Sequence, residues 1–450
     1  MTFNFKSAVI ILLVFLVSSL NACSISIPTP SHSSSELQRE PTRQATPVDG
    51  LQEITSQPNK VLTKWDLWTS GKTQLRGANI WQSLVLPDVD ADTKGYDRVG
   101  PPFSQEDFNQ LAALGANYVI LSVPGIFIEN PPYRVDPEVQ QNLDNLLDMA
   151  AKADLFATIA FRTGPGRAEW SLCCKGGAEW KGYFNDNVWK DAAAQQAWTE
   201  MWRTTAERYH NHPAVVGYEL MVQPDADDIL LNIWDPNEFY PQYANTLYDW
   251  NQFFPKIVTA IREVDQDTPI IVGGAGYSSI DWLPYLQPIA VTKIVYDIHQ
   301  YQPYELYTHQ GSKSYNSYPG NYDLNGDGQL EDFDQKWLQE LFQPVLDYSI
   351  KNKVPITVNE YGLERWVPNA AKYIFDQTEL FETHGWNYAI WEWSTSYRLF
   401  FQTVNEFNFR IGPDPANMIN SVPNELMDSI KYFWQRNLVR PSNVAWNKNS

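Results

Sequence analysis

Eight short apolar runs recur along this chain after residue 65, and they constrain its fold more than any other feature. Runs of this length with β-branched and aromatic residues are typical of buried strands. They are Leu75–Ile80, Tyr118–Val123, Phe156–Phe161, Val215–Met221, Ile270–Gly273, Lys293–His299, Ile356–Asn359 and Tyr388–Trp391.

Longer stretches with helical periodicity separate most of these runs. They are Gln105–Leu114, Val139–Ala153, Ala192–Tyr209, Tyr243–Val264, Phe333–Lys351, Ala371–Thr383 and Glu425–Arg436. Strands that alternate with helices indicate a parallel sheet, and eight such units close into an α/β (β/α)₈ TIM barrel. We therefore predict a single catalytic domain from residue 63 to residue 440, with a rim insertion at 303–334.

The composition of the chain limits which classes of ligand it can bind. The 450 residues carry a formal net charge of −20, which repels polyphosphates and anionic lipid surfaces. Aromatic residues make up 14% of the chain, and their flat apolar faces suit stacking on sugar rings. A neutral ligand is therefore favoured over nucleic acid.

The amino terminus has the pattern of an export signal. Lys6 precedes an apolar run, Ala8–Leu20, that is too short for a typical membrane-spanning helix. Leu20-Asn21-Ala22-Cys23 is similar to a bacterial lipobox, which predicts a lipoprotein signal peptide over 1–22 and acylation of Cys23; an ordinary signal with an incidental cysteine is the alternative. Residues 23–62 read as a flexible Ser/Thr/Pro tether and 441–450 as a tail. This pattern predicts a bacterial cell envelope protein, lipid-anchored and facing outside the cytoplasm.

The other two cysteines, Cys173 and Cys174, are adjacent in the sequence. A bridge between neighbouring cysteines requires a strained ring, so a bridge and two free thiols both stay open.

Active sites of such barrels lie at the carboxyl ends of the strands. The polar and aromatic residues at these positions suit a sugar: Asn79, Ser122, Arg162, Gln223, His299, Tyr301, Glu360, Trp391 and Trp393. Glu360 is the one carboxylate among them, which predicts a chemical role; an ion pair on the rim is the alternative.

Several ordered segments resemble glycoside hydrolase family 5, over roughly residues 63 to 440. They are Leu75-Arg-Gly-Ala-Asn-Ile80, Gly115-Ala-Asn117, His212-Pro213-Ala-Val-Val-Gly217-Tyr-Glu-Leu220, Tyr296-Asp-Ile-His299-Gln-Tyr301, Val358-Asn-Glu360-Tyr-Gly362 and Ala389-Ile-Trp391-Glu-Trp393. The resemblance implies a retaining hydrolase of β-linked glycans with Glu360 as nucleophile. It also implies that His299 and Tyr301 position the substrate, and that Trp391 stacks on a sugar while Trp393 is either a second sugar contact or core.

Three positions depart from the family pattern. The acid/base glutamate of the family falls on Gln223, which cannot exchange a proton, and two further family positions hold Ile120 and Arg162. Loss of a general acid typically costs about 10² to 10⁴ in rate, so slow turnover is expected unless another carboxyl substitutes. The candidates are Glu219, Asp225, Asp227 and Asp228.

Arg162 and Arg167 flank a Gly-Pro-Gly turn. They either clamp a ligand group or pair with a carboxylate of the site.

The segment from Asp323 to Asp334 has the spacing of an EF-hand calcium loop. It predicts a structural Ca²⁺ on the rim, and an acidic solvated turn is the alternative. The ligands at positions 1, 3, 5, 7 and 12 would be Asp323, Asn325, Asp327, Gln329 through its carbonyl, and Asp334.

Two functions follow from these observations. The first is a surface-tethered retaining glycoside hydrolase, monomeric and without an organic cofactor. The second is a catalytically impaired carbohydrate-binding protein on the same barrel. Gln223 is the residue that separates the two.

Overall fold

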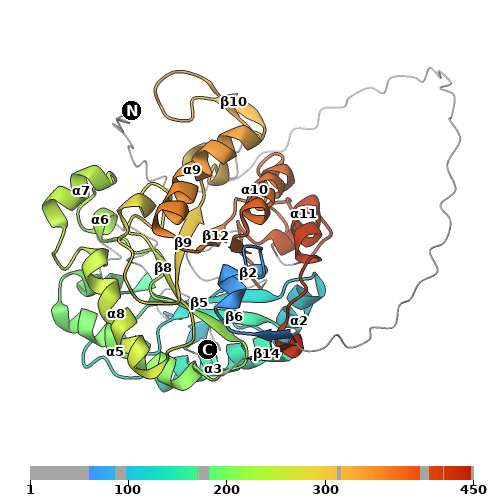
Figure 1. Cartoon of the computed structure of the whole chain (residues 1–450). Helices are drawn as coiled ribbons and strands as arrows, with labels where there is room; N and C mark the ends of the chain where they lie inside the picture. Colours follow the sequence, from blue (N-terminus) through green and yellow to red (C-terminus); the bar gives the residue numbers. More distant parts are fainter. Residues whose placement is uncertain are drawn as a thin grey trace, which may run out of the picture. The chain divides into compact units, whose positions relative to one another are not determined.

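In the computed structural model, eight parallel strands close into a barrel, as the sequence predicts (Figure 1). The structure describes residues 60–86, 98–169, 171, 182–311, 316–395, 405–418 and 420–446. The strand order around the barrel is β12-β13-β2-β5-β6-β7-β8-β9. In chain order the strands are β2 Arg76–Trp81, β5 Tyr118–Pro124, β6 Phe156–Thr163, β7 Val215–Glu219, β8 Ile270–Gly273, β9 Ile294–Gln300, β12 Ile356–Tyr361 and β13 Asn387–Ile390.

Apolar side chains fill the inside of the barrel. Tyr118, Phe156, Ile271 and Val295 are completely buried and belong to one inner cluster. Gly77 on β2 is required for close strand packing, because a Cβ at this position would lie 1.7 Å from the carbonyl oxygen of Tyr118. The barrel is thus a packed core, and its chemistry is confined to its ends.

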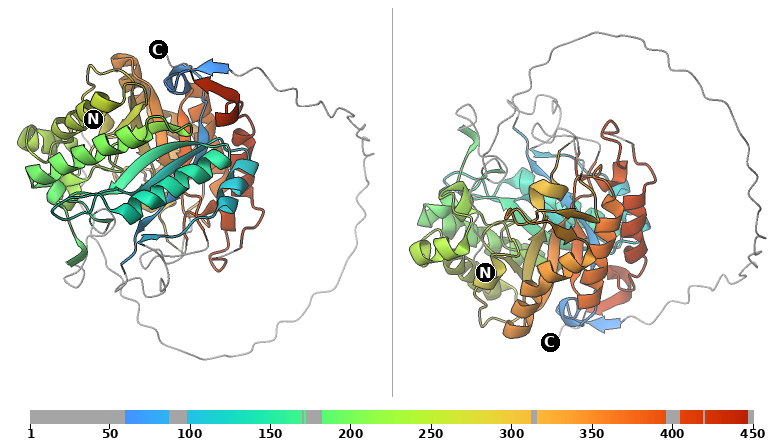
Figure 2. Two further views of the ribbon diagram at one scale, coloured as in Figure 1. Left: turned by 90° about the horizontal axis from the view of Figure 1, so that it is seen from below. Right: turned by 90° about the horizontal axis from the view of Figure 1, so that it is seen from above.

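Helices surround the strands (Figure 2). Aspartates at the N-caps of α3, α5, α8 and α9 accept backbone N–H groups and start these helices where the chain leaves a loop. The larger helices are α2 Gln105–Ala113, α3 Pro137–Lys152, α5 Ala192–Tyr209, α8 Trp250–Val264, α9 Gln335–Asn352, α10 Ala370–His384 and α11 Glu425–Trp434.

The expected helix 243–264 is shorter than predicted. The chain forms α7 over Pro236–Tyr243 and begins α8 only at Trp250. Asp249 causes this break, because its carboxylate accepts the backbone N–H groups of Asn245 at 2.9 Å and Asn251 at 3.0 Å. Capping by a short polar side chain thus prevails over the helical periodicity of the segment.

Short elements complete the fold. Two-stranded sheets pair β1 with β14, β3 with β4 and β10 with β11. The strands are β1 Lys60–Leu62, β14 Val444–Trp446, β3 Ser83–Leu84, β4 Val99–Gly100, β10 Gly320–Tyr322 and β11 Glu331–Phe333. The short helices are α1 Asp66–Thr69, α6 Ala226–Ile229, η3 Asn187–Trp189, η4 Leu283–Tyr285, η5 Tyr304–Thr308, η6 Phe409–Ile411 and η7 Pro441–Asn443. Because Trp446 packs on Phe156, with ring centroids 5.9 Å apart, residues 60–62 and 444–446 are part of the folded body.

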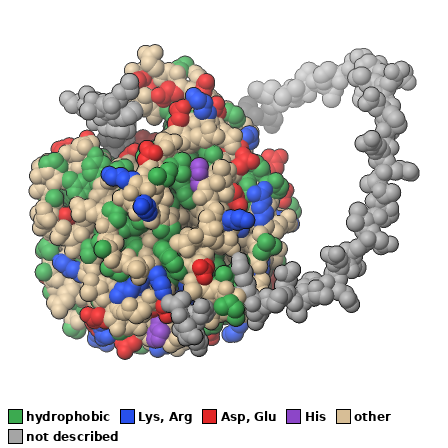
Figure 3. Space-filling model, viewed as in Figure 1, with side chains coloured by type: hydrophobic (Ala, Val, Ile, Leu, Met, Phe, Trp, Pro, Cys, Tyr) green, Lys and Arg blue, Asp and Glu red, His purple; other side chains and the backbone are tan. Residues whose placement is uncertain are grey.

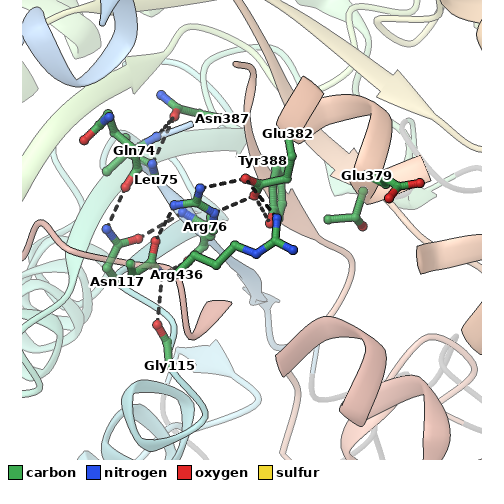
Figure 4. Close-up of polar contacts among 12 residues, drawn as sticks. Gln74, Leu75, Arg76, Gly115, Asn117, Glu379, Glu382, Asn387, Tyr388 and Arg436 are labelled. Carbon is green, nitrogen blue, oxygen red and sulfur yellow. Dashed lines mark hydrogen bonds and ion pairs between the residues drawn. The ribbon is translucent and has the colours of Figure 1, made fainter. Parts of the chain in front are cut away.

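The amino end of the barrel is held by one ion-pair cluster (Figure 4). Arg76 on β2 donates to both carboxylate oxygens of Glu382 on α10, at 2.5 and 2.7 Å. The hydroxyl of Tyr388 on β13 donates to the same carboxylate at 2.8 Å, and Arg436 approaches it to 3.9 Å. This cluster ties the first barrel strand to the last.

Some expectations lie outside the described residues. Cys23, Cys173, Cys174 and the whole segment 1–59 are among them. None of the helices within the described ranges is long and apolar enough to cross a membrane.

Candidate active site

Glu360 lies at the carboxyl end of β12, and its side chain is held by His299 on β9 and by Tyr301, which directly follows β9. The Tyr301 hydroxyl donates to Oε2 of Glu360 at 3.1 Å, and Nδ1 of His299 lies 3.4 Å from the same oxygen. Glu360 is 4% exposed. These contacts hold one carboxylate oxygen, Oε2, in place, and nucleophilic attack requires a fixed carboxylate.

A buried network continues below Glu360 into the barrel. Nε2 of His299 lies 3.0 Å from Asp297 Oδ2 and 3.7 Å from Glu219 Oε1. The side-chain amide of Asn359 donates to Glu219 at 2.6 Å. Glu219, Asp297 and His299 also have the spacing of a metal site, with ligand atoms within 4.8 Å of one another. At 3.0 Å the imidazole and the Asp297 carboxylate interact strongly as charges, although neither Nε2 nor Oδ2 forms a hydrogen bond of good geometry.

The charges of the network perturb one another. Burial by itself lowers the pKa of His299, but the carboxylates of Glu360 and Asp297 outweigh burial and hold that pKa well above its usual range. Burial raises the pKa of Glu219 to about 7, and the charges of Asp297 and Glu360 add to this effect while His299 opposes it. Titrating groups with such shifts cluster at functional sites.

Arg162 at the end of β6 forms the opposite wall of the mouth. Its guanidinium pairs with Glu169 at 2.8 Å. Its Cζ lies 5.3 Å from the ring centroid of Trp391 and 6.0 Å from that of Trp81. Arg162 therefore pairs with Glu169 rather than with Glu360 or Glu219, and it fixes the two indoles by cation–π contacts.

Gln223 follows β7 at the position of the missing acid, and its backbone is clamped. Its φ is +52°, a strained conformation for a non-glycine residue. The buried guanidinium of Arg167 donates to the carbonyls of Gln223 at 2.6 Å and Val222 at 2.7 Å, and it pairs with Asp225 at 2.8 Å. Arg167 is thus a positioning residue for the backbone at 223 and is not a ligand clamp.

The other carboxyls considered as substitute acids are engaged inside the same loop. Asp225 also accepts the indole N–H of Trp189 at 3.0 Å. Asp228 accepts the Tyr277 hydroxyl at 2.8 Å, and Asp227 accepts the backbone N–H of Gly276 at 3.1 Å. All three are at most 4% exposed. Glu219 is buried too, so all four carboxyls considered as substitute acids are buried.

The remaining expected site residues are placed as follows. Asn79 donates to the carbonyl of Asn359 at 2.7 Å, and its Oδ1 is buried without a partner. Ser122 is buried and lies 3.4 Å from Nη1 of Arg162. Ile120 packs in the inner cluster of the barrel, where the family arginine would stand.

Trp393 does not reach the mouth. It is 2% exposed, donates its indole N–H to the carbonyl of Asp107 at 3.0 Å and is covered by Arg410 at 4.7 Å. Of the two expected tryptophans, Trp393 therefore belongs to the core, whereas Trp391 is only half-buried.

Three residues of the site were not predicted from the sequence. Asp297 precedes His299 by two positions on one strand, and Trp81 follows Asn79 by two, so strand alternation is a signal that could have found both. Glu169 lies in the loop after β6 with no motif around it. Only the folded loop brings it to Arg162.

The expected calcium loop folds as a tight turn on the rim. The backbone N–H of Asp327 donates to the side-chain oxygens of Asp323 at 3.0 Å and Asn325 at 2.9 Å. Glu331, at a position not expected as a ligand, accepts the amide of Asn325 at 2.8 Å. Asp334 accepts the backbone N–H of Trp337 at 3.0 Å and thereby caps α9.

The closed barrel and the fixed carboxylate at its carboxyl end define the class of (β/α)₈ barrel glycosidases. Comparisons with known proteins support this classification. The model of the family described as Cellulase (glycosyl hydrolase family 5) matches residues 86–397. Since the match spans more than half of the sequence, the chain belongs to glycosyl hydrolase family 5 and is a glycoside hydrolase.

Individual relatives are distant. Endoglucanase C of Acetivibrio thermocellus is 22% identical over 352 residues, which cover 70% of this chain and 90% of that protein. The crystal structure of a glycoside hydrolase superposes with a TM-score of 0.58 at 21% identity, covering 80% of this chain and 99% of the other. The structure of endoglucanase Cel5A from Thermotoga maritima gives a TM-score of 0.56 at 20% identity, covering 82% and 100%. At these identities the structural likeness establishes the fold alone.

Proposed function

We propose that this protein is a retaining glycoside hydrolase of β-linked glycans, with Glu360 as nucleophile and Gln223 at the acid/base position. The observation that carries the proposal is the Glu360 carboxylate, fixed by Tyr301 and His299 at the barrel mouth. The family match and the relatives named as endoglucanases support the β-linked substrate.

Each half of the reaction uses the site differently. In the first half, Glu360 attacks the anomeric carbon and the leaving oxygen departs, which requires a proton unless the leaving group is already stable as an anion. In the second half, water attacks the glycosyl ester and must lose a proton. Gln223 assists neither transfer, so both halves are slow for an ordinary glycan.

The test compares two leaving groups. We expect turnover of a dinitrophenyl β-glycoside, which needs no protonation, and slow or no hydrolysis of unactivated oligosaccharides. Sodium azide, a nucleophile that needs no base, should accelerate the dinitrophenyl reaction and yield a glycosyl azide of retained configuration. No reaction with any activated β-glycoside would overturn the proposal.

The second candidate function is a carbohydrate-binding protein without turnover. Gln223 is the observation that favours it, since it removes the proton donor and leaves the rest of the site intact. Calorimetric binding of oligosaccharides in the absence of any aryl glycoside hydrolysis would establish this reading.

We also propose that the protein is attached to the bacterial envelope by lipid on Cys23, with residues 23–59 as a spacer. The support is the apolar run ending in Leu20-Asn21-Ala22-Cys23. Cys23→Ser should release the protein from the membrane fraction and stop incorporation of labelled palmitate. Unchanged fractionation of that variant would contradict the anchor.

Finally, we propose a structural Ca²⁺ in the Asp323–Asp334 loop. The proposal is supported by the side-chain oxygens of Asp323 and Asn325, which converge on the backbone N–H of Asp327, and by positive φ at Gly326 and Gly328, which lets the loop turn sharply. Calcium should raise Tm in wild-type protein by mass action and not in Asp323→Ala. An equal response to EDTA in both proteins would rule out this loop as the site.

A further inference from the structure

Four polar side chains lie together in the barrel below the nucleophile, and three of them carry an atom without a hydrogen-bond partner. Within the part of the chain that the structure describes, these atoms are Ser278 Oγ, Asp297 Oδ2 and His299 Nε2. The fourth residue is Glu219, and all four are at most 4% exposed. Buried polar atoms without partners are costly, so a ligand bound by all of them would stabilise the cluster.

Asn359 holds one oxygen of each carboxylate and leaves the other oxygen near His299. Its side-chain amide donates to Glu219 Oε2 at 2.6 Å, and its backbone N–H donates to Asp297 Oδ1 at 2.9 Å. The remaining oxygens, Glu219 Oε1 and Asp297 Oδ2, lie 3.7 Å and 3.0 Å from His299 Nε2. Hydrogen bonds to the outer oxygen in this way orient carboxylates that bind metals.

Glycine at position 273 leaves space beside these atoms. A Cβ on Gly273 at the end of β8 would lie 2.1 Å from Ser278 Oγ and 3.3 Å from Asp297 Oδ2. The hydroxyl and the carboxylate oxygen therefore border the same small space, which any larger residue at 273 would enter. Ser278 is fixed there, because its carbonyl accepts the backbone N–H of His299 at 2.9 Å.

The distances and the donor atoms fit a divalent transition metal. Zinc binds histidine nitrogen and carboxylate oxygen at about 2.0 to 2.2 Å, so two of its ligand atoms are about 3 to 4 Å apart. The separations of 3.0 Å and 3.7 Å from Nε2 lie in this range. An imidazole among oxygen ligands suits zinc better than calcium or magnesium, and the ion offsets the charge of two buried carboxylates.

We propose that Glu219, Asp297 and His299 bind one zinc ion below the nucleophile, with the Ser278 hydroxyl as a further ligand. Zinc on Nε2 leaves the proton of the neutral imidazole on Nδ1, which lies 3.4 Å from Oε2 of Glu360. The ion thus orients the nucleophile from below and has no contact with substrate. The raised pKa values of Glu219 and His299 are those of the protein without the ion.

The metal content of the full chain tests this site independently of the proposed function. Protein is produced in medium with added zinc, purified without a histidine tag and analysed by elemental mass spectrometry. Wild type should contain about one zinc per chain. Asp297→Asn retains the oxygen that accepts the N–H of Asn359 and should lose the zinc, as should Glu219→Gln. Ser278→Ala should retain zinc and release it to a weaker chelator than wild type does.

Two variants serve as controls and should retain the zinc of wild type. Asp428→Asn changes an exposed carboxylate on α11, and Asp323→Ala removes a carboxylate of the rim loop. Wild-type protein produced with cobalt in place of zinc should show the strong visible absorption of a four-coordinate Co²⁺, a readout that needs no variant to fold. Wild type without bound metal, or with equal zinc in Asp297→Asn and Glu219→Gln, would overturn the site, while labelling of Glu360 by a fluorosugar would still decide the proposed function.

Discussion

At the amino end of the barrel, Arg76 places two nitrogens on the two oxygens of Glu382, and Tyr388 adds a third hydrogen bond. At the carboxyl end, His299 lies among Glu360, Asp297 and Glu219 with neither ring nitrogen in a well-formed hydrogen bond. Both clusters are buried and charged. The first has matched charges and satisfied geometry, whereas the second has excess negative charge and perturbed protonation.

We infer from this difference that the cluster at the amino end contributes to stability and that the cluster at the carboxyl end contributes to chemistry. A satisfied ion pair holds strands together and has no capacity to accept or release a proton near neutral pH. Crowded carboxylates around an imidazole cost stability, and they persist where catalysis needs them. The comparison predicts that substitutions at the two ends have different consequences.

The largest effect is expected at Glu360. Glu360→Gln removes the nucleophile and should lower kcat for an activated glycoside by on the order of 10⁴ or more, because no other group forms the glycosyl ester. Steady-state kinetics with the dinitrophenyl substrate measure this loss of kcat. The control Glu305→Gln, at an exposed glutamate on η5, should leave kcat unchanged, and equal losses in both variants would argue against a special role for Glu360.

Gln223→Glu should have the next largest effect, in the opposite direction. A proton donor restored at this position is expected to raise hydrolysis of unactivated oligosaccharides by about 10² to 10⁴-fold. Since Arg167 binds the backbone carbonyl of Gln223, the substitution leaves that clamp in place. Product release is followed by chromatography, with Gln242→Glu on the surface of α7 as control. A correctly folded variant with no gain would contradict the alignment of Gln223 with the family acid.

At the amino end, Arg76→Met should cost stability and not chemistry. It leaves the Glu382 carboxylate, only 12% exposed, without the guanidinium that hydrogen-bonds to both of its oxygens and with only the more distant Arg436 as counter-charge. Breaking a buried pair costs about 3 to 5 kcal/mol. Urea unfolding measures the loss, and kcat per folded molecule should be unchanged. Lys336→Met breaks an exposed pair with Glu340 and serves as control, and it should leave the urea midpoint unchanged.

The smallest effect is a pH dependence of stability. The native state raises the pKa of Glu219 to about 7, so between pH 4.5 and 7 it holds a proton that the unfolded chain has released. The free energy of unfolding therefore falls as pH rises through this window, and the raised pKa of His299 acts in the same direction. Glu219→Gln, whose amide oxygen still accepts from Asn359, should flatten the profile.

Chemical denaturation at intervals from pH 4.5 to 8 tests this prediction. Glu263→Gln, at an exposed position on α8, is the matched control and should retain the wild-type slope. A wild-type slope in Glu219→Gln would mean that other groups determine the pH dependence.

The strands were predictable because a strand that is buried in a barrel forms a short run of apolar residues in the sequence. All eight apolar runs became barrel strands with bounds within two residues, and Ile270–Gly273 is identical to β8. Glu360, His299 and Tyr301 were predictable for the same reason, since strand ends fix where side chains gather. In Figure 3, acidic and basic side chains are interspersed over the visible face.

The rest depended on contacts that are remote in sequence or set by loops. The pairing of Arg162 with Glu169 needs the folded loop after β6, and Arg167 reaches Gln223 across 56 residues of sequence. The break before α8 depends on two hydrogen bonds of Asp249, which the helical spacing of apolar residues does not predict.

Trapping of the glycosyl intermediate tests the central claim most directly. A 2-deoxy-2-fluoro β-glycoside with a dinitrophenolate leaving group should transfer its sugar to a carboxylate of the protein, and the absent base at position 223 should slow hydrolysis of the glycosyl ester. Mass spectrometry of peptides is expected to place one fluorosugar on Glu360. A label on Glu169 or Glu219, or steady turnover of the activated substrate with no label on Glu360, would contradict the account.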